Sequence, residues 1–239
     1  MINNNIFLQD LDELNLKLSN NQLSKFDYYL ELLISENEKF NLTTITEPSE
    51  IYKKHFIDSL SLISYGLNFF TDTKVIDIGS GAGFPGIPLK IAFPHLKITL
   101  LDSTNKRISF LEDVIDKLNL SDIKPIHGRA EEFAHQSFFR AQYDLCVSRA
   151  VANLSTLSEY CLPFVKLGGL FIAYKGEDID TEISEAQNST SLLGGQLDKQ
   201  MNFTLPNSNI SRSLIGIKKI KETPVKYPRR AGLPGKRPL

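Results

Sequence analysis

The 239-residue chain is predicted to fold as an α/β protein with a doubly wound, mostly parallel sheet. After residue 73, short runs rich in Val, Ile and Leu alternate with helical stretches, which is typical of parallel strands covered on both faces. The first run ends in the glycine-rich segment Asp77-Ile78-Gly79-Ser80-Gly81-Ala82-Gly83. The last two runs are separated by a short turn, which predicts an antiparallel hairpin at one sheet edge.

Residues 1–70 are predicted to form an N-terminal helical cap. Leu8, Leu11, Leu14 and Leu18 recur at helical spacing, and a second such series begins at residue 23. After a polar stretch, Pro48 suits the first turn of a third helix. The amphipathic pattern carries no functional signal of its own, so these helices are interpreted as a cover for the core.

Residues 71–221 are predicted to form the α/β core. Its strand candidates are short and apolar, and the segments between them have helical periodicity. The predicted strands are Lys74–Ile78, Ile98–Leu101, Ile123–Ile126, Tyr143–Val147, Leu170–Tyr174, Gly195–Leu205 and Ser211–Lys221. The predicted helices lie near Ile87–Phe93, Asn105–Leu118 and Leu154–Leu162.

Residues 222–239 are predicted to form a basic, extended tail. From Lys218 to Leu239 there are eight Lys or Arg residues and one Glu, a local charge of +7, whereas residues 1–217 carry −8. Such cations suit the phosphates of a nucleic acid, and Tyr227 is placed to stack on a base. Pro and Gly residues are expected to prevent a helix. A solubilising, disordered tail is the alternative interpretation.

The composition excludes several classes of protein. No apolar run is long enough to span a bilayer, and the N-terminus does not have the profile of a signal peptide. Two cysteines, Cys146 and Cys161, are too few for a disulfide framework or a thiolate metal site, and both are interpreted as inert core thiols. A cytoplasmic location is expected, with no metal and no obligate protein partner. The four histidines, His55, His95, His127 and His135, also do not have the spacing of metal ligands or of a catalytic triad.

The glycine-rich segment predicts a nucleotide-type pocket at the carboxyl end of the first strand. Glycine permits positive φ and close approach to a ligand, and the following helix offers unpaired N–H groups. The spacing Gly81-x-Gly83-x-x-Gly86 also satisfies the loose dinucleotide pattern. The Asp77 carboxylate would repel a pyrophosphate but attract the ammonium and sulfonium of S-adenosylmethionine, which is therefore the predicted cofactor. A glycine turn made only for packing is the alternative.

Other candidate residues follow the later strands, because ligands of such sheets bind beyond the carboxyl ends of the strands. Asp102 stands 21 residues after Gly81 and is expected either to accept hydrogen bonds from ribose hydroxyls or to cap the next helix. Ala130 and Glu131 follow the third strand, where they suit the adenine edge, or Glu131 serves as a first-turn helix acid. Arg149 follows the fourth strand. It is expected to contact a ligand carboxylate, an RNA phosphate or the target base, and a solvated surface position is the alternative.

Two missing features narrow the type of methyl transfer. Cytosine-5 methylation requires a nucleophilic thiolate in a polar setting, which neither cysteine offers. Methylation of an adenine amino group usually goes with an Asp/Asn-Pro-Pro-aromatic loop, where this chain has Ser148-Arg149-Ala150-Val151. Guanine N7 needs neither device, because its own lone pair is the nucleophile and alignment suffices. No catalytic residue is therefore certain, and Arg149 is the only candidate. The target guanine is expected to be unpaired or flipped out.

Six segments are distinctive in combination. They are Asn41-Leu42-Thr43, His55-Phe56-Ile57-Asp58-Ser59-Leu60, the glycine segment continued by Phe84-Pro85-Gly86-Ile87-Pro88, Arg129-Ala130-Glu131-Glu132 with Ser148-Arg149-Ala150-Val151, and Arg230-Ala231-Gly232-Leu233-Pro234-Gly235-Lys236. With them, nearly the whole chain resembles the bacterial small-subunit ribosomal RNA guanine-N7 methyltransferases. The resemblance implies a class I methyltransferase fold, S-adenosylmethionine as cofactor, and a guanine of 16S rRNA, free or in the 30S subunit, as target. It also implies cofactor contacts at Gly79, Phe84, Ala130, Glu131 and Arg149.

Two other functions stay open at this point. A nucleotide-cofactor oxidoreductase is favoured by the loose glycine pattern together with Asp102. A non-catalytic RNA-binding assembly factor would keep the same fold and the same basic tail.

Overall fold

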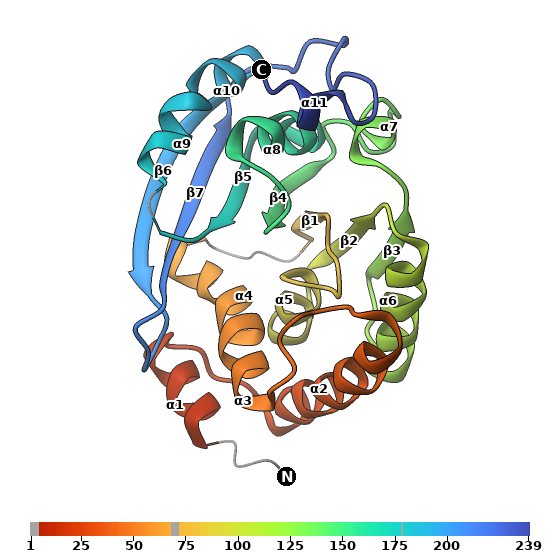
Figure 1. Cartoon of the computed structure of the whole chain (residues 1–239), viewed down its shortest axis with the longest axis vertical. Helices are drawn as coiled ribbons and strands as arrows, with labels where there is room; N and C mark the ends of the chain where they lie inside the picture. The colour runs from red at the N-terminus through yellow and green to blue at the C-terminus, as the bar shows by residue number, and fades with distance from the viewer. Residues whose placement is uncertain (1–4, 68–71, 178) are drawn as a thin grey trace.

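The computed structural model of the chain describes residues 5–67, 72–177 and 179–239. Its centre is a seven-stranded sheet of order β3-β2-β1-β4-β5-β7-β6 (Figure 1). β1 to β5 are parallel, whereas β7 runs antiparallel to both β5 and β6, so the predicted sheet with an edge hairpin is confirmed. The strands are β1 (Lys74–Ile78), β2 (Lys97–Asp102), β3 (Ile123–His127), β4 (Tyr143–Arg149), β5 (Val165–Lys175), β6 (Gly195–Thr204) and β7 (Ser211–Lys219).

Helices cover both faces of this sheet, and each face has its own cluster of buried apolar side chains. The three predicted core helices are confirmed to within one residue as α5, α6 and α8. The helices are α1 (Asn5–Glu13), α2 (Asn20–Phe40), α3 (Pro48–Ile51), α4 (Asp58–Leu60), α5 (Gly86–Ala92), α6 (Asn105–Lys117), α7 (Ala130–Phe133), α8 (Leu154–Cys161), α9 (Asp180–Glu185), α10 (Gln187–Leu192) and α11 (Leu233–Lys236). A π-helical segment, Tyr52–Ile57, joins α3 to α4, and 3₁₀ turns follow at Ser61–Tyr65 and Leu162–Phe164.

The N-terminal helices pack on the sheet as part of one core. Ser19 and Gln22 form a capping box that starts α2, and Pro48 begins α3 as predicted. Phe26 and Phe56 are fully buried in the same apolar cluster as strand residues of β1 and β2. Residues 1–4 and 68–71, which include the predicted boundary between cap and core, lie outside the described residues. The division into domains at that boundary therefore stays a prediction.

A bond network also ties α2 to the segment that follows β1. The Gln22 side-chain amide donates to the carbonyl oxygens of Ile91 and Ala92, at the end of α5. The buried Tyr29 hydroxyl donates to the carbonyl oxygen of Ala82, inside the glycine-rich loop. Because α2 holds this loop from behind, the helical cap positions the loop as well as covering the core.

The C-terminal segment, residues 222–239, contradicts the prediction of an extended tail. Tyr227 is only 6% exposed, so its ring is not free to stack on a base. The segment also contains the short helix α11, which the Pro and Gly residues were expected to prevent. Gly232 has a φ of +79° and allows the turn that begins this helix. The Pro of α11 stands in its first turn, where a missing N–H costs nothing.

Two arginines explain why this segment folds onto the core. Arg140 donates to the carbonyl oxygens of Thr223, Pro224 and Tyr227, which satisfies a run of backbone that has no strand partner. Arg229 makes a two-pronged ion pair with Glu159 of α8, with distances of 2.9 Å from Nε to Oε1 and 2.7 Å from the guanidinium NH2 to Oε2.

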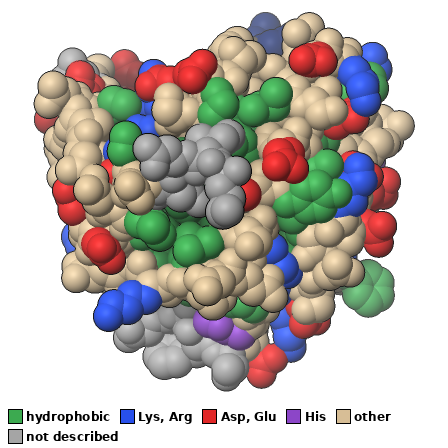
Figure 2. Space-filling view, turned by 90° about the horizontal axis from the view of Figure 1, so that it is seen from below, with side chains coloured by type: hydrophobic (Ala, Val, Ile, Leu, Met, Phe, Trp, Pro, Cys, Tyr) green, Lys and Arg blue, Asp and Glu red, His purple; other side chains and the backbone are tan. Residues whose placement is uncertain are grey.

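Two surface observations complete the fold. Within the described residues, no helix combines the length and the apolar character that crossing a membrane requires. On the face seen from below, acidic and basic side chains are interspersed, and neither sign gathers in one patch (Figure 2). This face therefore offers no concentrated field for a polyanion.

Candidate cofactor site

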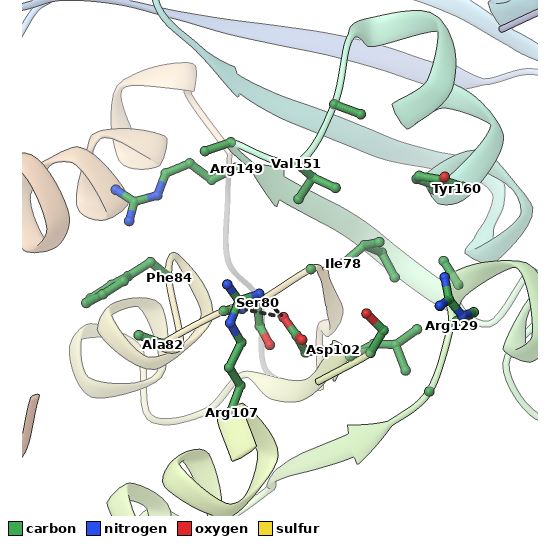
Figure 3. A pocket seen from close by; sticks show the side chains of 18 of the residues that line it. Ile78, Ser80, Ala82, Phe84, Asp102, Arg107, Arg129, Arg149, Val151 and Tyr160 are labelled. Carbon is green, nitrogen blue, oxygen red and sulfur yellow. Dashed lines mark hydrogen bonds and ion pairs between the residues drawn. The ribbon is translucent and has the colours of Figure 1, made fainter. Parts of the chain in front are cut away.

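A cavity of about 560 Å³ opens beyond the carboxyl ends of the central strands (Figure 3). Its position is the point between β1 and β4 where the strand order reverses, which is where ligands of doubly wound sheets bind. Its size falls within the range of small-molecule sites. The structure brings all but one of the predicted contact residues to its wall, namely Gly79, Gly81, Phe84, Asp102, Ala130, Glu131 and Arg149.

Gly81 and Asp102 form the floor of the cavity. Gly81 has a φ of +59°, and a methyl group added there would meet no protein atom nearer than the Gly79 carbonyl oxygen at 3.9 Å. Its N–H donates to Asp102 Oδ2 at 2.9 Å, while Oδ1 accepts from the Thr104 N–H at 2.8 Å. Asp102 thus ties the glycine loop to the start of α6. Oδ2 also accepts from the Arg107 guanidinium at 3.3 Å, whereas Oδ1 keeps a second lone pair that can accept a bond from a ligand.

Asp77 is the predicted contact residue that the structure does not bring to the cavity. Its side chain is fully buried beneath the loop, where Oδ2 accepts the Gly86 N–H at 2.9 Å. The side chains of a strand alternate between faces, and Asp77 shares the face of Val75, toward α5 and away from the opening. Burial raises the pKa of its carboxyl to about 7, against the lowering by the Gly86 N–H and by Arg149. Asp77 therefore braces the loop rather than lining the pocket.

At one end of the cavity, Glu131 meets the C-terminal segment. Its Oε1 accepts the Gly232 N–H at 2.8 Å, and the residue is 6% exposed. Gly235 of α11 and Tyr160 of α8 line the same end. Figure 3 shows Arg129 and Tyr160 there, with Asp102 between this end and the centre. The C-terminal segment is thus one wall of the cavity, which the sequence did not indicate.

At the other end, Arg149 and Phe84 lie together (Figure 3). The Arg149 guanidinium is 5.0 Å from the centre of the Phe84 ring and donates to Asp58 Oδ2 at 2.8 Å. The His55 ring stacks on Phe84 with centres 4.4 Å apart, and its Nδ1 lies 3.0 Å from Arg149. Asp58 also pairs with Arg212 of β7. Arg149 is therefore an anchored, nearly buried cation rather than a solvated surface residue.

His55 and Asp58 belong to the site although they were not predicted from the sequence. Both stand in a segment that carries the family resemblance, but His55 meets Arg149 across 94 positions of the chain. No local spacing could have revealed that contact. The signal that was present is chemical: a histidine and an aspartate on a predicted buried helix need polar partners.

The stability of the protein should report the burial of His55. Burial, and then the Arg149 guanidinium, lower the pKa of His55 from 6.5 to about 3. Between about pH 3 and pH 6.5 the unfolded chain binds a proton at this residue that the folded chain does not, so stability falls as the pH drops. As the pH is lowered, the free energy of unfolding of wild type, measured with denaturant, should fall by up to about 1.4 kcal/mol per pH unit relative to that of His55→Gln. The exposed His95→Gln variant is the control, and parallel curves for wild type and His55→Gln would contradict the expectation.

The fold and the site are together those of a class I methyltransferase. Among solved structures, the chain is similar to precorrin-6y C5,15-methyltransferase from Geobacter metallireducens, with a TM-score of 0.50, 16% identity, and coverage of 75% of this chain and 91% of that one. It is also similar to geranyl diphosphate methyltransferase in complex with SAM, with a TM-score of 0.53, 10% identity, and coverage of 68% and 84%. At these identities the likeness concerns the fold alone.

The chain belongs to the family of rRNA small subunit methyltransferase G, whose model matches residues 22–222. It is 50% identical over 240 residues to ribosomal RNA small subunit methyltransferase G of Lachnoclostridium phytofermentans, covering 100% of this chain and 98% of the relative. The protein of the same name from Lactobacillus acidophilus is 48% identical over 234 residues, covering 98% of each. The predicted resemblance is confirmed. The protein is therefore an rRNA methyltransferase that uses S-adenosylmethionine, and not an oxidoreductase.

Proposed function

We propose that the protein transfers a methyl group from S-adenosylmethionine to N7 of a guanine in 16S rRNA. One cavity with two chemically different ends supports the proposal. Hydrogen-bonding carboxylates, Asp102 and Glu131, lie toward one end, and a cation over an aromatic ring, Arg149 on Phe84, lies at the other. The first end suits an adenosine, and the second suits the methionyl part together with a base brought to the methyl group. A cytoplasmic location follows from the ribosomal substrate.

The residues present fit the proposed cofactor. Gly81 leaves open space over its backbone that no protein side chain fills, which is what close approach of a ligand requires. Ser80 Oγ, in the same loop, is buried and has no hydrogen-bond partner within the described structure. Asp102, Ala130 and Glu131 would hold the adenosine, and Gly79, Gly81, Phe84 and Arg149 the methionyl part. The cofactor supplies a methyl group already activated by a sulfonium.

The chain's own contribution to the reaction is alignment. Guanine N7 is unprotonated at neutral pH, so no residue has to act as a general base. The Phe84 ring and the Arg149 guanidinium give a flat, rigid end to the pocket, because Asp58 and His55 fix the arginine. Arg149, the only catalytic candidate of the sequence, is thus proposed as a positioning residue.

Mass mapping of 16S rRNA after incubation with isotopically labelled S-adenosylmethionine tests the proposal. Deproteinised 16S rRNA and 30S subunits are compared as substrates, from a strain that lacks the gene. One 7-methylguanosine should appear at one position in at least one of the two. Label on another atom would overturn the assignment to N7, and cofactor binding with no transfer to either substrate would overturn the proposal in favour of the non-catalytic assembly factor.

The exposed cations of the C-terminal segment are proposed to contact RNA phosphates. Arg230, Lys236 and Arg237 are exposed beside the cavity, and none of them lines it. Replacing all three by glutamine should lower RNA affinity and reduce the slope of log K against log salt by about 2, since each phosphate contact on a single strand contributes roughly 0.7. The affinity for S-adenosylhomocysteine should not change.

A matched control uses the opposite edge of the sheet. Lys74, Lys97 and Lys166 are exposed at or near the amino ends of their strands, away from the cavity. Their triple glutamine variant has the same charge change and should keep the wild-type salt slope. Equal slopes for all three proteins would show that the C-terminal cations do not contact RNA. Deleting the whole segment is not a clean test, because it also removes a cavity wall.

A further inference from the structure

A chain of hydrogen bonds connects Arg149 to Thr43 through His55. The Arg149 NH2 group lies 3.0 Å from His55 Nδ1, and His55 Nε2 lies 2.9 Å from Thr43 Oγ1. Thr43 stands between α2 and α3, and it lines the cavity together with His55 and Arg149. The three residues therefore form one polar cluster at the Phe84 end of the site.

The direction of each bond in this chain is fixed by donor chemistry. A guanidinium only donates, so His55 Nδ1 has to accept from Arg149. The single proton of the neutral imidazole then sits on Nε2 and is donated to Thr43 Oγ1. The neutral form is also the favoured one, because burial lowers the pKa of His55 to about 3.

Thr43 Oγ1 is left with a proton to donate. It accepts from His55 and also from the Ile45 backbone N–H, at 3.1 Å, so both of its lone pairs are used. Among the described residues the hydroxyl has no acceptor for its own proton. The backbone is held as well, because the Thr43 N–H donates to Asn37 Oδ1 at 2.8 Å. The result is a fixed hydroxyl that can act only as a donor, in the wall of the cavity.

We propose that the Thr43 hydroxyl donates to O6 of the target guanine and so selects guanine over adenine. O6 and N7 are neighbouring acceptors on one edge of guanine, whereas adenine has N7 beside an amino donor. A donor-only hydroxyl near the methyl group would therefore accept guanine with N7 in place and oppose the amino group of adenine. This inference rests on the proposed function and adds the residue that reads the base.

The test pairs two variants with two substrates. Thr43→Val removes the hydroxyl at nearly constant shape, and Thr43→Ser keeps it. The substrates are 16S rRNAs carrying, at the mapped target position, either guanine or 2-aminopurine, which keeps N7 but has no O6. On guanine, kcat/KM of Thr43→Val should fall about 3- to 10-fold, the effect of one hydrogen bond, whereas Thr43→Ser stays near wild type. On 2-aminopurine, wild type and Thr43→Val should be equal.

The outcomes separate the inference from its alternatives. A loss for Thr43→Val of equal size on both substrates would mean that the hydroxyl only braces the loop, and would overturn the proposal. A rise in the Kd for S-adenosylmethionine by the same factor would assign the hydroxyl to the cofactor, and would also overturn it. Thermal unfolding of each variant identifies a loss caused by misfolding. If wild type transfers no methyl to guanine N7, it is the proposed function that fails.

Discussion

Arg229→Ala should lower the free energy of unfolding by about 3 kcal/mol, because it leaves a buried carboxylate without its partner. Glu159 has a side chain that is 1% exposed, and it accepts the Arg229 backbone N–H as well as the two guanidinium bonds. The midpoint of thermal unfolding should fall by roughly 6–12 °C. Cofactor affinity should also fall, because Arg229 holds the segment that places Gly232 on Glu131 and Gly235 in the cavity wall.

The double variant Arg229→Ala with Glu159→Gln is the control for the buried charge. It removes the carboxylate that the single change leaves unpaired, so it should be more stable than Arg229→Ala alone. Cofactor affinity should remain low in both proteins, because the segment has lost its anchor in each. A single variant as stable as wild type would show that the ion pair does not hold the segment.

Gly83→Ala should mainly lower stability and Gly81→Ala should mainly lower cofactor affinity, although the two glycines are only two residues apart. A methyl group at Gly83 would lie 2.5 Å from Ile87 Cγ1 and 2.7 Å from the Tyr29 hydroxyl, both packed inside the core. We expect a loss of about 2–4 kcal/mol in stability from this overpacking and the strained φ of +101°. At Gly81 the methyl would enter the cavity, so cofactor affinity should fall about tenfold or more while stability changes by roughly 1 kcal/mol.

Gly168→Ala separates the cost of backbone strain from the cost of the clash. Gly168 has a φ of +79°, and no protein atom lies within 4 Å of an added methyl group. The difference in stability between Gly83→Ala and Gly168→Ala therefore measures packing behind the glycine loop. Calorimetric titration with S-adenosylhomocysteine measures the other effect. Unchanged affinity for Gly81→Ala would remove the loop from the cofactor site.

The sequence was sufficient where structure is encoded locally. The strands and the helices α5, α6 and α8 follow from runs of apolar residues and their period, and the carboxyl-end rule then places Asp102, Ala130, Glu131 and Arg149 in one cavity. β5 begins five residues before its predicted start, because its exposed residues 166–168 interrupt the apolar pattern. Local periodicity reports burial, so it misses the exposed part of a strand.

What the sequence could not provide depends on contacts between distant residues. The fold of the C-terminal segment requires Glu159 and Arg140, which lie about 70 and 90 residues earlier in the chain. The buried position of Asp77 depends on which face of β1 its side chain lies on. The alternation of side chains along a strand does not by itself show which face is directed toward a ligand. Its burial under the loop overturns the direct contact that the charge argument predicted, although the cofactor that the argument selected is confirmed.

The shared core of the N-terminal helices and the sheet has a consequence for synthesis on the ribosome. Tyr29 and Phe56 pack against Phe84, and α2 packs against α5, so these N-terminal residues are translated before part of the surface that covers them. Until Phe84 and α5 emerge, the nascent helices present a cluster of aromatic rings to solvent, a type of surface to which chaperones bind and which favours aggregation. The N-terminal helices are therefore expected to reach their final arrangement only after the α/β segment that follows them has been made.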